Sequence, residues 1–381
     1  MEEGCSKGMK DERMPVVLIP SLEPDDRLPA YITQLMENGF SRVVVVNDGS
    51  APSYQPIFDR ISTLGATVLG YAVNQGKGEA LKTGYRWILE HEPDCIGVLT
   101  ADADGQHTVP DCLKLAEALR SGEDALWLGS RDFNLPNIPP KSRTGNKLTS
   151  LVFKLLYGVW LPDTQTGLRA FPRGELAFMA EVPGARYEYE MNVLIACARR
   201  KLPIHAITIE TIYENNNEGT HFHPIRDSWR IYKVILGNFF KFMASSLICF
   251  GVDQLLFNLF RSWLFPLLGL HLQVKLPLGM TLDNTSLANY TARLFSAILN
   301  FKLNEELVFK VKGRKGTAWR YAATCVVIII LSTLGIKALG LLGMAPWLAK
   351  LICDFLLYFV SYRIQQSWVF AEEKKKEAPN P

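Results

Sequence analysis

Two carboxylates separated by one residue form the segment of the chain best suited to chemistry. Asp102 and Asp104 follow an apolar run at residues 96–100, and Gln106 comes two residues later. Two close carboxylates at a strand end can hold a divalent cation together with a diphosphate, and the cation offsets the charge of a departing phosphate ester. The alternative is a solvated turn in which an Asp caps the helix beginning near Val109. The pattern alone leaves both interpretations open.

Two further polar segments follow apolar runs. Pro20 and Ser21 end the first run, and Asp48 and Gly49 end the second, where they also fit an ordinary turn. Three polar strand ends on one sheet edge are the arrangement expected of a nucleotide-diphosphate pocket. The glycine-rich turn that carries Lys77 adds a cation, although it lacks the Gly-x-x-x-x-Gly-Lys-Ser/Thr pattern of a Walker loop.

The elements that must position these residues alternate between short apolar runs and helical patterns. This alternation predicts an α/β domain with a mostly parallel, doubly wound sheet, in which ligands bind at the carboxyl ends of strands. Dense Val, Ile and Leu indicate strands buried on both faces. The predicted strands are 16–20, 42–48, 67–72, 95–102 and 125–130, and the predicted helices are 25–38, 78–91 and 109–120.

The second half of the chain contains much longer apolar segments than the first. Each of four apolar segments is close to the roughly 20 residues that cross a bilayer. A large buried helical core is the alternative. Lys and Arg cluster before the first segment, between the second and third, and after the fourth, which predicts four spans with both ends in the cytosol. These basic clusters could also attract anionic lipids. The predicted spans are 239–260, 287–309, 321–342 and 347–370.

The predicted membrane half contains an internal duplication. Residues 300–309 match residues 361–370 in character up to the sixth position, and both end in Val-Phe. A duplicated helical hairpin would explain the match. Charged residues inside the predicted spans could serve function or could reach the interface by extending their side chains. They are Asp253, Arg293, Lys350 and Asp354.

Composition and charge argue against several classes of protein and of metal site. A formal net charge of +3 gives no reason to expect nucleic-acid binding. Seven scattered cysteines without Cys-x-x-Cys spacing predict neither a disulfide framework nor a thiolate metal site, and they favour a reducing cytosol. The first fourteen residues are polar, so we expect no cleavable signal peptide.

The order of the polar motifs resembles that of glycosyltransferase family 2, in particular its dolichol-phosphate mannose synthase and polyprenyl-phosphate glycosyltransferase branch. The resemblance covers about residues 15–232. The membrane half resembles the GtrA-like family in Tyr362, Arg363 and the Trp-Val-Phe at 368–370. The motifs of the first resemblance are Ile19–Ser21, Val46–Ser50, Asn74–Gly78, Ala101–His107, Gly129–Arg131 and Asp163–Gly167.

The resemblance implies a GT-A (Rossmann-like) domain followed by an all-α membrane domain of four helices. The implied boundaries are a flexible tail at 1–14, the GT-A domain at 15–228, a juxtamembrane helix at 229–238, the GtrA-like domain at 239–371 and a basic tail at 372–381. The protein would be a multi-pass protein of a bacterial plasma membrane, with its catalytic domain in the cytosol. Whether it forms a homo-oligomer stays open.

Roles on the donor side follow from the same resemblance. Pro20 and Asp48 would line the nucleoside pocket, and Lys77 would bind the nucleotide sugar. Asp102 would contact the ribose or the diphosphate. The metal ligands would be Asp104 and Gln106, which supply oxygens suited to Mg or Mn.

On the acceptor side, the resemblance implies that Arg131 and Arg143 are catalytic and hold a lipid phosphate, because guanidinium groups match phosphate geometry. A surface ion pair is the alternative for each Arg. Residues 215–222 depart from the mannose synthases, since Asn216 lies near the position of an Arg in that branch. Arg226 is then expected to take over phosphate binding. The acceptor loop would contain Asp163, Gln165 and Arg169.

The implied activity is transfer of one sugar, with inversion, from GDP-mannose or a UDP-hexose to dolichyl or undecaprenyl phosphate at the cytosolic face of the membrane. The acceptor phosphate is already an anion, so no general base is needed. One alternative is a synthase fused to a flippase for the lipid-linked sugar. Another is a polysaccharide synthase, although residues 365–368 lack the Arg of the Gln-x-x-Arg-Trp motif.

Overall fold

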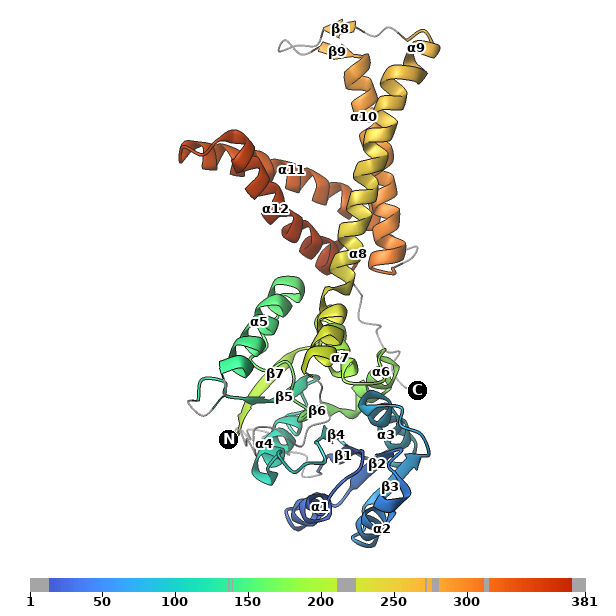
Figure 1. The fold of residues 1–381 in the computed structure, drawn as a ribbon, viewed down its shortest axis with the longest axis vertical. Helices are drawn as coiled ribbons and strands as arrows, with labels where there is room; N and C mark the ends of the chain where they lie inside the picture. The colour runs from blue at the N-terminus through green and yellow to red at the C-terminus, as the bar shows by residue number, and fades with distance from the viewer. Residues whose placement is uncertain are drawn as a thin grey trace, which may run out of the picture. The chain divides into compact units, whose positions relative to one another are not determined.

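The computed structural model describes residues 14–135, 138, 140–210, 224–270, 273–275, 281–311 and 315–371. The chain divides into two compact units, Met1–Ile235 and Leu236–Pro381. Figure 1 shows the ribbon of both units.

The first unit is built on a seven-stranded sheet with strand order β3-β2-β1-β4-β6-β5-β7. All neighbouring strands are parallel except β6, which is antiparallel to β4 and to β5. The predicted mostly parallel sheet is confirmed, and the five predicted strands correspond to β1–β5. The strands are β1 (Val16–Ser21), β2 (Val43–Asp48), β3 (Thr67–Tyr71), β4 (Gly97–Thr100), β5 (Leu126–Arg131), β6 (Arg169–Pro172) and β7 (Ile204–Ile209).

Helices connect and cover these strands. Three of them, α1, α3 and α4, lie where the helical patterns predict them. The helices of the first unit are α1 (Arg27–Glu37), α2 (Gln55–Thr63), α3 (Lys77–His91), α4 (Val109–Leu119), α5 (Pro140–Tyr157), α6 (Leu176–Glu181) and α7 (Glu188–Arg200).

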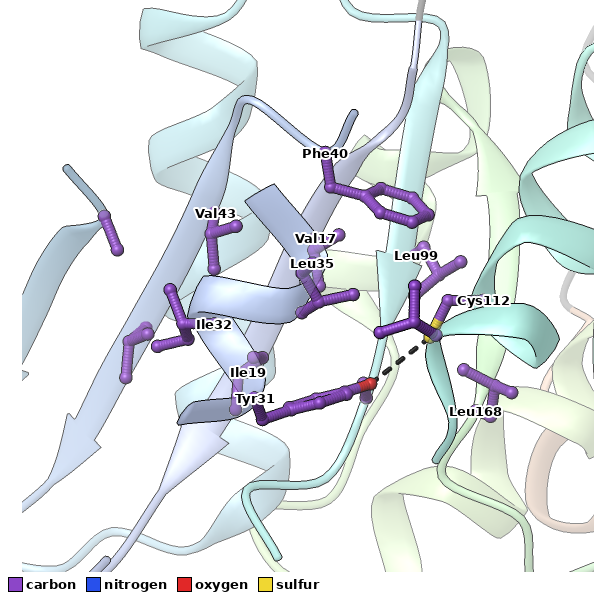
Figure 2. Packing of buried hydrophobic residues seen from close by; sticks show 14 of the residues in the cluster. Val17, Ile19, Tyr31, Ile32, Leu35, Phe40, Val43, Leu99, Cys112 and Leu168 are labelled. Carbon is purple, nitrogen blue, oxygen red and sulfur yellow. Dashed lines mark hydrogen bonds between the residues drawn. The ribbon is translucent and has the colours of Figure 1, made fainter. Parts of the chain in front are cut away.

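A continuous hydrophobic core holds α1 and α4 on the central strands (Figure 2). Leu28, Ile32 and Leu35 recur at helical spacing and are fully buried. The Tyr31 hydroxyl lies 3.2 Å from the Cys112 thiol across this core. Burial raises the pKa of Cys112 to about 12, so this thiol is protonated at neutral pH.

The antiparallel strand β6 brings a distant segment to the sheet edge where β4 and β5 end. Arg169, its first residue, is in register with Thr100 of β4 and Leu128 of β5. The loop that precedes β6 therefore arrives where the parallel strands leave the sheet. Its placement is fixed by one more contact, because the Thr100 hydroxyl donates to the Gly167 carbonyl at 2.8 Å.

The second unit is mainly helical, and α8 enters it from the first unit. One helix in the described ranges, Trp229–Leu267, is long and apolar enough to cross a membrane, and Thr317–Ser332 is a shorter apolar helix. The number of four spans stays a prediction. The elements are α8 (Pro224–Leu259), α9 (Phe265–Leu267), α10 (Asn284–Leu303), α11 (Thr317–Leu341), α12 (Pro346–Ile364) and a two-stranded sheet of β8 (Gln273–Lys275) and β9 (Thr281–Asp283). Three π-helical turns occupy Phe260–Leu264, Asn304–Val308 and Gln365–Val369.

Two of these π-helical turns fall in the two segments that match in sequence. Asn304 opens one turn and Gln365 opens the other, and the Asn304 amide donates to Gln365 Oε1 at 3.0 Å. Each amide also donates four residues back along its own helix, to Asn300 Oδ1 and to Ser361 Oγ respectively. Corresponding residues thus make corresponding contacts, which agrees with a duplicated hairpin.

The charged residues predicted inside the spans are partly placed. Asp253 on α8 is buried and accepts a hydrogen bond from Ser296 Oγ at 3.1 Å. Its other oxygen lies 3.9 Å from Nε of Arg293, whose side chain is exposed. The side chains of Lys350 and Asp354 lie outside the described part of the structure. The role of the pair stays a prediction.

Candidate functional site

The carboxyl ends of β1, β2, β4 and β5 share one edge of the sheet, because these strands all run in the same direction. Pro20 is buried near the end of β1, in register with Val46. Next to it, the Ser21 hydroxyl is buried and has no hydrogen-bond partner among the described residues. A buried polar atom without a partner costs free energy, so its presence at this edge is consistent with a ligand site.

Asp48 organises the turn that carries Lys77. Its carboxylate is buried and accepts hydrogen bonds from the backbone N–H groups of Gln75 at 2.8 Å and Gly76 at 3.0 Å. The Asn74 side-chain amide donates to it at 3.2 Å. These contacts hold the turn against the end of β2. Asp48 therefore positions Lys77 through the backbone of the turn.

Lys77, the first residue of α3, joins two carboxylates. Its ammonium lies 2.7 Å from Asp102 Oδ1 and 3.0 Å from Glu190 Oε1. Burial lowers its pKa, but the two negative charges outweigh burial and hold the pKa above its ordinary value. Lys77 is therefore charged and fixed in direction. Glu190 lies on α7, more than a hundred residues away, and nothing in the sequence pattern indicated that it reaches this site.

Asp102 has a side-chain partner at each of its oxygens. His107 Nε2 lies 3.2 Å from Oδ2, opposite the contact with Lys77. Burial raises the pKa of Asp102, but Lys77 and His107 outweigh it and hold the pKa below its ordinary value. A Cβ on Gly167 would lie 2.4 Å from Oδ2, so only glycine lets this loop approach the carboxylate so closely.

Asp104 has a different environment. Its Oδ1 accepts a hydrogen bond from the Gln106 backbone N–H at 3.0 Å, and its second oxygen has no partner in the described part of the chain. Burial and the nearby charge of Asp102 raise the pKa of Asp104. A carboxylate whose charge is not offset by a side-chain cation is the member of the pair better suited to a metal.

The donor set at this position fits a divalent cation that is completed by a substrate. Asp104 supplies a carboxylate and Gln106 an amide oxygen, and the Gln106 side chain makes no hydrogen bond within the described ranges. Across those ranges, no group of three or more His, Cys, Asp or Glu side chains is arranged to hold a metal. Magnesium commonly takes one or two protein carboxylates and fills its other positions with phosphate and water.

Arg131 and Asp163 form a two-point ion pair at the end of β5. Arg131 Nε donates to Asp163 Oδ2 at 2.7 Å, and Nη2 donates to Oδ1 at 3.2 Å. Asp163 is fully buried and also accepts from the Gln165 backbone N–H at 3.0 Å. The pair fixes the plane of the guanidinium. Gln165 itself is exposed.

The other predicted acceptor residues are placed differently. Arg143 on α5 donates through Nη2 to the Leu135 carbonyl at 2.8 Å, and its buried Nε has no partner among the described residues. Arg169 is buried and donates to the carbonyls of Thr166 and Glu190 at 3.0 and 2.9 Å. These contacts make Arg169 a link between the loop and α7. The side chain of Arg226, like residues 215–222, lies outside the described part of the structure.

Two family descriptions match the chain. The model for glycosyl transferase family 2 matches residues 16–175, and the model for the GtrA/DPMS transmembrane domain matches residues 267–370. The first match contains β1–β6 and all residues of the site except Glu190. The second lies within the helical unit.

Curated relatives match the first half. An uncharacterized protein of Methanocaldococcus jannaschii is 30% identical over 229 residues, which cover 59% of this chain and 92% of that protein. The UDP-N-acetylglucosamine–dolichyl-phosphate N-acetylglucosaminyltransferase of Methanococcus voltae is 26% identical, over 53% of this chain and 87% of that enzyme. The undecaprenyl-phosphate mannosyltransferase of Micrococcus luteus is 28% identical, over 48% of this chain and 77% of that enzyme.

Proposed function

Because the chain belongs to glycosyl transferase family 2 and carries a GtrA/DPMS transmembrane domain, we propose that it transfers one sugar from a nucleotide-diphosphate sugar to a polyprenyl phosphate. The two named relatives use different sugars, and both names specify a polyprenyl phosphate. The acceptor class is therefore better supported than the sugar. The protein spans the membrane several times, and the reaction takes place at the cytosolic face of the membrane.

The observation that carries this proposal is the unequal pair of carboxylates at the end of β4. Asp102 is ion-paired with Lys77 and hydrogen-bonded to His107, whereas Asp104 keeps an oxygen without a partner within the described ranges. One carboxylate of the pair is thus committed to the protein, and the other is available to a cation. This division suits a site that binds a diphosphate through a metal.

Donor binding rests on residues of β1, β2, β4 and α3. Pro20 and the turn held by Asp48 form the nucleoside side of the pocket, and Lys77 and Asp102 face the diphosphate side. Asp104 and Gln106 would hold Mg or Mn, which when bound offsets the charge of the departing nucleotide diphosphate. Lys77 adds a fixed positive charge to the same region.

Acceptor binding rests on the loop that enters β6 and on α5. Arg131, held in one plane by Asp163, and Arg143 present guanidinium groups to the lipid phosphate. The phosphate oxygen attacks the anomeric carbon directly and the nucleotide diphosphate leaves from the opposite side. The anomeric configuration is inverted, and no covalent bond to the enzyme forms. Catalysis comes from positioning and from charge stabilisation.

The test is transfer of label from a panel of nucleotide sugars to extracted polyprenyl phosphate by the full-length protein. Asp104→Asn and chelation of divalent cations should each abolish the transfer. Asp124→Asn, a change of the same chemistry at an exposed position, should leave it intact. Folded protein that labels no lipid from any donor with metal present would refute the proposal, as would a polymer product. Retention of the anomeric configuration would refute inversion.

A further inference from the structure

A segment outside the family match closes over the turn that carries Lys77. The match to glycosyl transferase family 2 ends at residue 175, and this segment is residues 184–190, where α7 begins. Its Ala185 carbonyl accepts a hydrogen bond from the Glu79 backbone N–H at 3.0 Å, and its Glu190 pairs with Lys77. We call residues 184–190 the clasp. The clasp holds the first turn of α3 in place.

Two glycines of the turn let the clasp approach this closely. A Cβ on Gly76 would lie 2.5 Å from Arg186 Cγ and 2.6 Å from the Ala185 carbonyl oxygen. A Cβ on Gly78 would lie 2.5 Å from Tyr189 Cβ. Because side chains do not approach other atoms so closely, the turn and the clasp pack together without space for a methyl group. The stem of Arg186 is therefore held against the turn.

Hydrogen bonds connect the guanidinium of Arg186 to the end of β2. Its Nη1 donates to Asn74 Oδ1 at 3.2 Å, and the Asn74 side-chain amide donates to Asp48 Oδ2 at 3.2 Å. The Arg186 side chain is exposed, and its guanidinium makes no second hydrogen bond or ion pair to the described residues. A planar guanidinium that is anchored at one nitrogen keeps its face available to a planar partner.

Val73 is a second unusual residue at this place. It is 72% exposed, which is the highest exposure of any large apolar side chain among the described residues of the first unit. The backbone beside it lies close to the end of β2, because a Cβ on Gly49 would lie 2.5 Å from the Val73 carbonyl carbon and 2.4 Å from the Asn74 nitrogen. Ligand pockets combine apolar surface with a few fixed polar groups, as these residues do here.

The distance from the carboxylate pair indicates which part of a nucleotide would reach these residues. In the strand order β3-β2-β1-β4, one strand separates β2 from β4, which at about 4.8 Å per spacing amounts to roughly 10 Å. A diphosphate held at Asp104, after β4, therefore leaves its nucleoside to lie across β1 towards β2 and β3. Val73 and Arg186 lie at the ends of these last two strands, away from the diphosphate.

We propose that Arg186 and Val73 form one wall of a nucleobase pocket, in which the guanidinium stacks on the ring of the base and the Val73 side chain contacts it. This inference rests on the proposed function, because it takes the ligand to be a nucleoside diphosphate. It assigns a base-binding arginine to the clasp, outside the family match. Stacking is possible with every base, so other residues select the nucleotide.

The test measures binding to the detergent-solubilised full-length protein by isothermal titration calorimetry with Mn²⁺ present. The ligands are UDP, GDP, CDP, ADP and inorganic pyrophosphate. Arg186→Gln should weaken binding of the preferred nucleoside diphosphate about tenfold, as expected for one desolvated cation–π contact, and should leave pyrophosphate binding unchanged. Arg86→Gln is the matched control and should change neither, since Arg86 is an exposed arginine of α3 that pairs with Glu79 at 3.0 Å.

Equal weakening of both ligands would overturn the inference, because it would show that Arg186 acts only through the turn and Lys77. A parent protein that binds none of the four nucleotides would overturn it as well. Binding without transfer of sugar to lipid would refute the proposed function alone. Transfer by a parent protein whose nucleotide affinity is unchanged in Arg186→Gln would refute this inference alone.

Two further variants separate stacking from charge. Arg186→Lys keeps the charge but not the plane, so it should bind the nucleoside diphosphate as weakly as Arg186→Gln; full recovery would overturn the stacking. Val73→Ser should weaken the same binding about fourfold, the value of about one buried methylene group, without lowering Tm. An unchanged affinity in Val73→Ser would show that the base does not lie against Val73.

Discussion

In the ion pair of Arg131 and Asp163, we expect removal of Arg131 to destabilise the protein more than removal of Asp163. Asp163 is fully buried, whereas 29% of the Arg131 side chain is exposed. Arg131→Met leaves a buried carboxylate without its cation, which should cost about 3–5 kcal/mol of unfolding free energy. Asp163→Asn leaves a guanidinium that can turn towards water, and the loss of its hydrogen bonds should cost about 1–3 kcal/mol.

Thermal unfolding of the detergent-solubilised full-length protein measures this difference. In a domain of this size, 1 kcal/mol corresponds to about 2–4 °C in Tm, so Arg131→Met should lower Tm by about 6–20 °C. Arg60→Met is the control, because the Arg60–Asp26 pair is exposed and should contribute less than about 1 kcal/mol. A larger loss for Asp163→Asn than for Arg131→Met would refute the reasoning from burial.

The same pair predicts a kinetic difference that a purely structural role would not produce. Arg131→Lys keeps the positive charge but loses the two-point geometry, so the KM for polyprenyl phosphate should rise while the KM for the nucleotide sugar stays unchanged. Equal changes in both KM values would show that Arg131 supports the whole site and does not contact the acceptor.

Three other predictions concern separate parts of the first unit. Gly167→Ala should reduce activity strongly in folded protein, because the new methyl group displaces the Asp102 carboxylate; normal transfer rates would contradict the close approach. Glu190→Gln should raise the KM for the nucleotide sugar about tenfold, because Lys77 loses one of its two anchors, and Glu190→Asp should recover part of the loss; steady-state kinetics measure both. Cys112 should resist alkylation at pH 8 in native protein, since a pKa of about 12 leaves only about one thiol in 10,000 ionised, and mass spectrometry of native and denatured samples would detect unexpected labelling.

The sequence predicted the central strands β1, β2 and β4, which are almost entirely buried, and also the partly buried edge strand β3. β1 and β2 consist largely of Val, Ile and Leu that are buried on both faces, and such runs are recognisable without knowledge of the fold. β7 is an edge strand in which His205 and Thr208 interrupt the apolar residues, so it lacks the continuous apolar run of β1 and β2. β6 has only four residues and begins with the charged Arg169. Its sequence therefore could not be distinguished from the polar motif at 163–167 that precedes it.

The candidate site was predictable where its residues follow strands, and unpredictable where a distant helix contributes. Asp48, Asp102 and Asp104 are local features of the sequence. The contact between Lys77 and Glu190 depends on how α7 packs against α3, which no short-range pattern encodes. Arg186 gave no signal either, because its contact with Asn74 joins residues that are 112 positions apart.

The reversed direction of β6 has a consequence for how this scaffold can vary. β5 ends at Arg131, and β6 begins at Arg169, which lies opposite Leu128 of β5 in the sheet. Everything between them, including α5 and the loop around Asp163, leaves and re-enters the sheet at one place. Insertions in the exposed connections of this segment do not shift the register of β1, β2 or β4. Those connections can therefore vary in length while the donor strands stay in place, whereas Gly167, which lies against Asp102, is constrained by the donor pocket.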